Sequence, residues 1–161
     1  MISFNSNTDL FVYFLIFIVI AIISRIYKDF GLRKEIDELK DNSMTLSPSE
    51  FFRLRNTRVG GHGRKMASVY NFADVYILYN KSRNMYYVGQ SKRIFDRVNA
   101  HFTGHGNGDV YIDYRYGDVF EISMIALENS GFSSLNELER NAIWRFNAYS
   151  RGYNKTRGNQ G

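Results

Sequence analysis

The chain opens with a long apolar run. Residues 10–23 read LFVYFLIFIVIAII, fourteen residues without a charge. If the run is helical, it is apolar on every side, whereas a half-exposed surface helix is apolar on one face only. Continued to Tyr27 it spans 18 residues, roughly 27 Å of helix, which approaches the thickness of a bilayer core. We predict an N-terminal anchor over residues 1–27 that contacts the lipid bilayer through residues 10–27.

The charges that flank this run predict its orientation. The preceding segment MISFNSNTD lacks Lys and Arg, whereas Arg25, Lys28, Arg33 and Lys34 lie at or beyond its far end. Because Lys and Arg mark the cytoplasmic side, we expect a single-pass protein of the cell (inner) membrane whose remaining chain is cytoplasmic. A buried core helix is an alternative, and a cleaved signal peptide fits less well because no small-x-small site follows the run.

Residues 28–72 are predicted to form a helical and basic juxtamembrane linker. Apolar side chains share one helical face within residues 28–41, which offers a contact for a homodimer. Residues 47–50 (SPSE) have the pattern of a helix start, with a serine cap, a proline and a glutamate that completes a capping box. Five basic residues and no acidic one lie within residues 51–65, which suits nucleic acid, an anionic lipid surface or a solubilising linker.

Residues 73–161 alternate between strand-like and helix-like patterns. We expect Ser91 and Ser134 to cap the two helices, and the Gly-rich residues 103–108 to form a loop. The order indicates a mixed α/β (α+β) domain, with a small three-stranded antiparallel sheet flanked by helices. The predicted strands are 74–80, 85–89 and 119–127, and the predicted helices are 92–102 and 134–149.

Composition narrows the chemistry. The 161 residues include 21 Lys and Arg against 16 Asp and Glu, for a formal charge of +5. With no cysteine, disulfides and a thiolate metal site are excluded, and three scattered histidines argue against a zinc site. The chain is mildly basic, as suits a protein that meets a polyanion.

One carboxylate stands out on the last predicted helix. On a helical wheel Glu139 falls inside the apolar arc, where a carboxylate is costly to bury without a cation or a proton. A salt bridge to Arg97 or Arg145 is the alternative explanation. Glu137 falls on the far side and has a structural explanation as the partner of Ser134 in a capping box.

Several spaced elements resemble the GIY-YIG nuclease family, over about residues 73–161. Asp74-Val75-Tyr76 stands where the family has Gly-Ile-Tyr, so the first glycine is replaced while the tyrosine is kept. The elements are Val75-Tyr76-Ile77, Tyr87-Val88-Gly89, Arg97, Phe120-Glu121-Ile122, Glu139 and Gly152-Tyr153-Asn154.

This resemblance implies hydrolysis of a phosphodiester with one divalent metal ion, Mg²⁺ or Mn²⁺, and no small-molecule cofactor. Glu139 would hold the metal, a hard ion that takes one or two carboxylates. Arg97 would stabilise charge on the phosphate. Tyr76 would take or orient the proton of the attacking water with support from Tyr87, and its pKa would have to be lowered by the metal and arginine.

Further candidates surround these residues. His101 shares a helix face with Arg97 and is a candidate phosphate ligand or proton shuttle, or a structural histidine. Asn154 is expected to fasten the C-terminal segment to the catalytic face. Gly89 lets the backbone approach the site. The candidate contacts for nucleic acid are Gly89, Lys92, Arg93, His105 and Arg115.

Together these observations predict a membrane-anchored, metal-dependent DNA endonuclease. Because no sequence follows residue 161, we expect low sequence specificity that comes mainly from phosphate contacts. Tethering suggests action on DNA that enters the cell, as in defence or superinfection exclusion. The alternatives are a soluble homing or repair-type nuclease and a catalytically inactive, membrane-tethered protein that binds nucleic acid.

Overall fold

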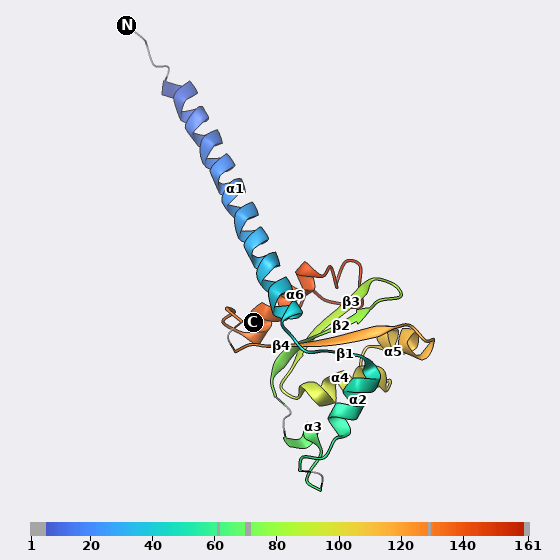
Figure 1. The fold of residues 1–161 in the computed structure, drawn as a ribbon. Helices are drawn as coiled ribbons and strands as arrows, with labels where there is room; N and C mark the ends of the chain where they lie inside the picture. Colours follow the sequence, from blue (N-terminus) through green and yellow to red (C-terminus); the bar gives the residue numbers. More distant parts are fainter. Residues whose placement is uncertain (1–5, 61, 70–71, 129, 160–161) are drawn as a thin grey trace. The chain divides into compact units, whose positions relative to one another are not determined.

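The fold is that of a computed structural model, which describes residues 6–60, 62–69, 72–128 and 130–159. The chain divides into two compact units, with the boundary between Glu35 and Ile36. The first unit is helical, and the second holds the sheet with the remaining helices. The helices and strands of the second unit are drawn in Figure 1.

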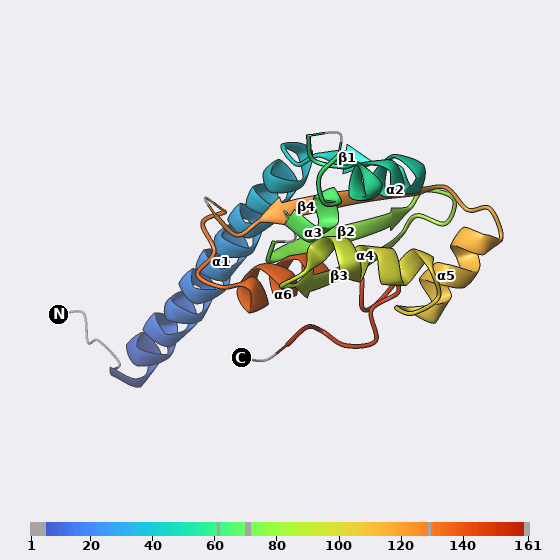
Figure 2. The same cartoon turned by 90° about the horizontal axis from the view of Figure 1, so that it is seen from below.

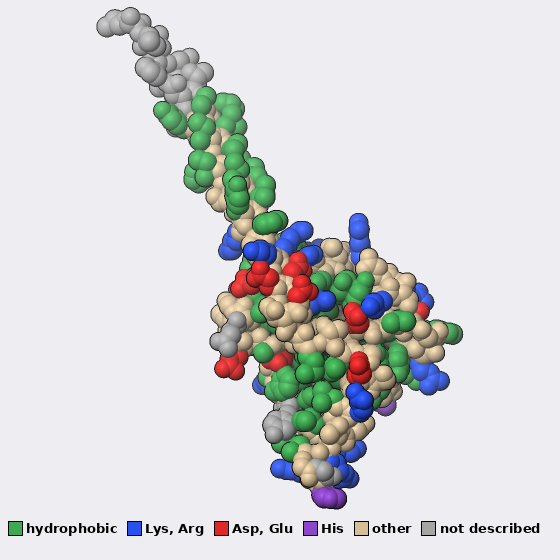
Figure 3. Space-filling model, viewed as in Figure 1, with side chains coloured by type: hydrophobic (Ala, Val, Ile, Leu, Met, Phe, Trp, Pro, Cys, Tyr) green, Lys and Arg blue, Asp and Glu red, His purple; other side chains and the backbone are tan. Residues whose placement is uncertain are grey.

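A 36-residue helix, α1 (Ser6–Asp41), contains the apolar run and continues across the unit boundary. Among the described residues, α1 is the helix that is long and apolar enough to cross a membrane. None of the residues in its apolar stretch is buried. Hydrophobic side chains cover the face of this helix seen in Figure 3. The predicted apolar helix is therefore confirmed, while its role as an anchor stays a prediction.

The predicted capping box is confirmed at the start of α2 (Pro48–Asn56). Ser47 Oγ accepts the backbone N–H of Glu50, and Glu50 Oε2 accepts the backbone N–H of Ser47. Both bonds satisfy donors that the first helical turn leaves without partners. After α2 a basic loop leads to the short helix α3 (Met66–Val69). Lys and Arg side chains gather at this end of the unit (Figure 3).

The sheet has four antiparallel strands in the order β1-β4-β2-β3, so the prediction of three strands was wrong by one. The additional strand β1 has only two residues, too few for an alternating pattern to reveal it. Thr45 and Leu46 pair with Ser123 and Ile122. The strands are β1 (Thr45–Leu46), β2 (Asp74–Asn80), β3 (Met85–Ser91) and β4 (Phe120–Ala126).

Three helices complete the unit, and their boundaries differ from the prediction. Ser91 does not cap α4; its Oγ accepts the N–H of Arg93, which is the actual N-cap. The helix α5 was not predicted and begins after Asn107. Ser134 caps α6 as expected, but that helix ends early because Asn147 adopts a left-handed φ of 51°. The helices are α4 (Ile94–Phe102), α5 (Gly108–Arg115) and α6 (Leu135–Arg145).

Apolar side chains pack on both faces of the sheet. Figure 1 shows α6 on one side and α2 and α4 on the other. Phe51 of α2 stacks on Phe95 of α4, with ring centroids 5.9 Å apart, over the face that carries Tyr76. On the opposite face Leu138 of α6 belongs to a cluster with Val75. Seen from below, α4 and α6 flank β3 (Figure 2).

Candidate active site

Tyr76 lies at the centre of the site and is almost completely buried. It comes from the middle of β2 and exposes 1% of its surface. Its hydroxyl lies 2.9 Å from Nε2 of His101. Burial raises the pKa of Tyr76 well above its usual value, and neighbouring Tyr87 adds to this effect, while Arg97 opposes it. Tyr76 is therefore a neutral phenol at neutral pH.

The tautomer of His101 follows from its two partners. The backbone N–H of Asn107 donates to Nδ1 of His101 at 2.9 Å, so Nδ1 carries no proton. Burial, with a smaller contribution from Arg97, lowers the pKa of His101 to about 3. The neutral ring therefore holds its proton on Nε2 and donates it to the Tyr76 oxygen. His101 is fully buried, which favours a role as a hydrogen-bond donor to Tyr76 over direct contact with phosphate or proton transfer.

Arg97 connects the buried tyrosine to the surface. It lies on the exposed side of α4 and hydrogen-bonds to both Tyr76 and Tyr87. Partial burial acts to lower the pKa of Arg97, but these two contacts outweigh it and the pKa is raised. The Tyr76 and Tyr87 rings stack with centroids 6.0 Å apart. The guanidinium thus remains charged while it holds two phenol oxygens.

Gly89 allows this packing. A Cβ at Gly89 would lie 2.5 Å from the Tyr76 hydroxyl oxygen and 2.7 Å from Cζ of the same ring. Real side chains do not approach so closely, and the ring has no free space in the core into which to retreat. The backbone at Gly89 thus packs closely against Tyr76, while its contact with nucleic acid stays a prediction.

Glu139 comes from α6 and is 8% exposed, as its place on the helical wheel predicted. Its Oε2 accepts a hydrogen bond of 3.0 Å from Nε2 of Gln90 on β3. Glu139, Tyr87, Arg97 and Asn154 line the same cavity of about 470 Å³. Four of the six predicted catalytic residues thus face one space, with Tyr76 and His101 behind its wall.

The donors present fit a hard divalent ion bound mainly by substrate and water. Among the described residues no cluster of three or more His, Cys, Asp or Glu is found. Glu139 lies in the cavity wall, and Asp109, also in that wall, is paired with Lys155. A single carboxylate suits Mg²⁺ or Mn²⁺ completed by water and phosphate oxygens.

Asn154 fastens the C-terminal segment to β3. Its Oδ1 accepts the backbone N–H of Val88 at 2.8 Å, and its Nδ2 donates to the Val88 carbonyl at 2.7 Å. The backbone N–H of Tyr153 donates to the carbonyl of Tyr86 at 2.9 Å. The side chain of Asn154 therefore holds the residue after Tyr87 in place.

The residue that replaces the first family glycine is also accommodated. Asp74 begins β2 in regular antiparallel register and is buried. Its carboxylate accepts the backbone N–H of Leu127 at 3.2 Å, which ties β2 to the end of β4. Burial raises the pKa of Asp74 to about 6, against the lowering effect of that bond.

None of the five predicted nucleic-acid contacts lines the cavity, and Gly89 packs against Tyr76. Lys92, Arg93, His105 and Arg115 are all exposed. Arg93 pairs with Asp96 at 2.6 Å. His105 lies within a residue of the wall residue Gly106, so it is the nearest to the cavity in sequence. Contact of these side chains with nucleic acid stays a prediction.

Two residues that contact the predicted catalytic residues were not predicted from the sequence. Gln90 bonds to Glu139, and Asn107 orients His101 through its backbone and begins α5 through its side chain. Gln90 gave no signal, because a glutamine in a strand has no characteristic pattern. Asn107 has the preferred residue type for an N-cap, followed by Asp109, and could have been recognised.

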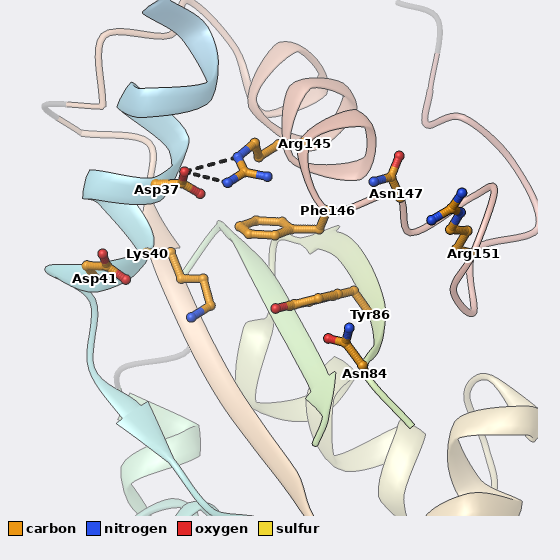
Figure 4. A pocket seen from close by; sticks show the side chains of 9 residues that line it. All are labelled: Asp37, Lys40, Asp41, Asn84, Tyr86, Arg145, Phe146, Asn147 and Arg151. Carbon is orange, nitrogen blue, oxygen red and sulfur yellow. Dashed lines mark hydrogen bonds and ion pairs between the residues drawn. The ribbon is translucent and has the colours of Figure 1, made fainter. Parts of the chain in front are cut away.

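A second cavity, of about 410 Å³, lies between the last turn of α1, the β2–β3 turn and the end of α6 (Figure 4). In it Arg145 donates to Oδ2 of Asp37 at 2.6 and 3.1 Å. Arg145 is therefore engaged by Asp37 and not by Glu139. In the described part of the chain, none of the predicted catalytic residues lines this second cavity.

Comparison with known proteins agrees with this geometry. Residues 72–154, just over half of the chain, match the GIY-YIG catalytic domain family. The match begins just before β2 and ends at Asn154, so it contains all six predicted catalytic residues. No curated protein and no solved structure matches the chain significantly.

Proposed function

Because the chain belongs to the GIY-YIG family of nucleases, we propose that it is a membrane-anchored endonuclease that cuts DNA entering the cell, with low sequence specificity. The family supports endonuclease activity on DNA and the general use of a divalent metal ion. The observation that carries the proposal is the cavity in which Glu139, Arg97 and Tyr87 face one space.

Glu139 and Arg97 would have different roles at the scissile phosphate. Glu139 would hold Mg²⁺ or Mn²⁺, which when bound neutralises charge on the scissile phosphate and the leaving oxygen. Arg97 would bind the non-bridging oxygens, whose charge grows in the transition state. Its forked donors suit this task, and its contacts with the two tyrosines fix its position.

Tyr76 and Tyr87 would handle the proton of the attacking water. Tyr87 lines the cavity, whereas Tyr76 lies behind it and is hydrogen-bonded to Tyr87. The Tyr87 hydroxyl would take the proton of the water as it passes its own proton to the phenolate form of Tyr76, which thereby becomes a neutral phenol. His101 Nε2–H and the Arg97 guanidinium both donate to the Tyr76 oxygen, so they stabilise this phenolate before it takes the proton.

The membrane part of the proposal rests on α1. Its length and composition permit a membrane span, and Arg25 and Lys28 follow the apolar run. The positive-inside rule then places the nuclease unit in the cytoplasm. Tethering would raise the local concentration of the enzyme where DNA crosses the membrane.

The test uses the full chain in detergent with supercoiled plasmid. We expect nicking in Mg²⁺ or Mn²⁺ and none in excess EDTA, and Glu139→Gln should lower the rate at least about 100-fold. Glu137→Gln on the same helix is the matched control and should cut normally. Equal cutting by the Glu139 variant would refute the metal assignment. Recovery of the full chain in the soluble fraction of lysed cells would refute the anchor.

A further inference from the structure

The loop between α2 and α3 contains a short two-stranded ladder. The backbone N–H groups of Val59 and Met66 donate to carbonyls on the opposite side of the loop, at 3.0 and 2.8 Å. Between these two hydrogen bonds Arg58 pairs with Lys65 in antiparallel register. Arg58 and Lys65 thus form a cross-strand pair without hydrogen bonds between them, the type of pair in which side chains lie closest.

This pair places two positive charges side by side. Directly opposite residues have Cβ atoms about 4.5–5.5 Å apart on the same face of a ladder. Both side chains are exposed, and Nη1 of Arg58 donates to the Gly63 carbonyl at 3.2 Å, a neutral acceptor. Among the described residues, neither Arg58 nor Lys65 forms an ion pair with Asp or Glu. Because like charges opposite each other repel, an anion that contacts both side chains would stabilise the pair.

The two helices that flank the ladder fix it to the sheet-containing unit. Phe51 of α2 stacks on Phe95 of α4, and Phe52 meets Phe102 edge-on with ring centroids 6.5 Å apart. Ala67 of α3 is buried in the same apolar cluster. The two charges are therefore held on the side of the sheet where α4 lies, the helix that supplies an arginine to the candidate active site.

The surroundings of the pair favour duplex DNA among the possible polyanions. Surfaces for single strands add aromatic rings on which bases stack, and residues 53–66 contain no Phe, Tyr or Trp. Binding to a lipid surface commonly adds apolar side chains that enter the bilayer, and none of the large apolar side chains described within residues 53–66 is exposed. The phosphates of a duplex require only positive charges.

We propose that Arg58 and Lys65 bind backbone phosphates of duplex DNA outside the catalytic cavity and hold the duplex while it is cut. The proposal rests on the nuclease function proposed above, to which it adds a second contact with the substrate. Both residues precede the family match at residues 72–154, and neither lines the cavity that contains Glu139. Contacts with phosphates are independent of base sequence, in keeping with a nuclease of low specificity.

The test measures binding of a labelled duplex by fluorescence anisotropy. The full chain is placed in nanodiscs of zwitterionic lipid in EDTA, where no cutting occurs. At about 0.1 M salt, the double variant Arg58→Gln, Lys65→Gln should bind the duplex at least about 10-fold more weakly. The slope of log affinity against log salt should become less steep by about 2, because each lost phosphate contact contributes about 1.

A matched control removes two positive charges elsewhere in the same unit. Lys40 and Arg151 both line the second cavity, and the double variant Lys40→Gln, Arg151→Gln should leave the affinity and the salt slope nearly unchanged. Equal loss in the two double variants would overturn the proposal, because the effect would then follow net charge alone.

A third variant, Arg58→Glu, separates binding from folding. It would place opposite charges across the ladder, an arrangement that stabilises a cross-strand pair. Thermal unfolding should therefore occur at the same or a higher temperature, while duplex binding should fall at least as far as in the double Gln variant. Normal duplex binding would overturn the proposal, and a marked fall in unfolding temperature would overturn the side-by-side arrangement on which it rests.

The same proteins distinguish a lipid partner and a failure of the nuclease function. Co-sedimentation of the parent with phosphatidylserine vesicles, lost in the double Gln variant while duplex binding persists, would assign the pair to a lipid surface and overturn the proposal. If plasmid stays intact in Mg²⁺ while duplex binding depends on Arg58 and Lys65, the nuclease function fails and the duplex contact stands. If plasmid is cut and the double Gln variant binds duplex normally, the nuclease stands and the duplex contact fails.

Discussion

The backbone N–H of Asn107 donates to Nδ1 of His101 at 2.9 Å and thereby determines which nitrogen of the ring carries the proton. A protonated Nδ1 would point its hydrogen at another donor, so the doubly protonated ring is disfavoured. This agrees with a pKa of His101 lowered by burial to about 3. His101 is thus a permanent donor to Tyr76 over the whole physiological pH range.

Replacing His101 should impair the chemical step more than binding. In His101→Phe the Tyr76 oxygen loses one of its two donors, so we expect kcat to fall about 100-fold with little change in KM. His101→Gln retains an N–H at a similar reach and should recover part of the rate. Thermal unfolding of both variants, followed by Trp144 fluorescence, controls for loss of fold. Identical kcat values for the two variants would argue against a donor role.

The rate should rise with pH from neutrality into the alkaline range. Burial keeps the pKa of Tyr76 well above its usual value, so the fraction of phenolate increases about tenfold per pH unit below that pKa. His101 adds no inflection between pH 5 and 8, because its pKa of about 3 lies below that range. Initial rates of plasmid cutting between pH 6 and 9 measure this. A bell-shaped profile centred near pH 6.5 would contradict it.

Asp74 should make the protein less stable as pH rises. In the folded chain the pKa of Asp74 is about 6, against 3.8 when unfolded. Between these values the folded state keeps a proton that the unfolded state has released, so stability falls from pH 4 to pH 6 and stays reduced above it. Asp74→Asn removes this cost, and we expect a gain of about 2 kcal/mol at pH 7.5.

Urea unfolding of Asp74→Asn and the parent at pH 4 and 7.5 measures the difference. At pH 4 the two proteins should be nearly equal in stability. The contribution of His101 has the opposite pH dependence, but it is present in both proteins and cancels in the comparison. A variant that is less stable at pH 7.5 would show that the carboxylate is a net stabiliser of the β2–β4 contact.

Gly89→Ala should disturb the site directly. Its methyl group would meet the Tyr76 hydroxyl at 2.5 Å, so the ring must move away from His101 or the strand must shift. Overpacking of this kind costs about 1–3 kcal/mol, and we expect at least about a 100-fold loss of cutting. Gly31→Ala, which has no atom within 4 Å, is the control and should cut like the parent. Normal cutting by Gly89→Ala would contradict the close packing.

The features that were predicted correctly depend on residues close together in the sequence. The capping residues Ser47 and Ser134, the β2–β3 hairpin and the burial of Glu139 all follow from short patterns, and the structure confirms them. Arg97 of α4 and Glu139 of α6 line one cavity beside the edge strand β3, although the two helices pack on opposite faces of the sheet. That arrangement was available only through the family resemblance.

The features that were not predicted depend on single residues or on contacts between residues that are far apart in the sequence. Strand β1 is fixed by pairing with a strand about eighty residues later, and two residues carry no period. The early end of α6 depends on one left-handed residue, Asn147. The protonation of His101 depends on Asn107, which lies in the loop before α5, a helix that was not predicted.

The bonds of Asn154 and Tyr153 to β3 affect how two copies of the chain can associate. β3 is an edge strand, and an edge strand offers unpaired backbone groups to another chain. The Asn154 amide occupies both groups of Val88, and Tyr153 occupies the carbonyl of Tyr86. The C-terminal segment thus blocks pairing of β3 with the edge strand of a second copy of the chain.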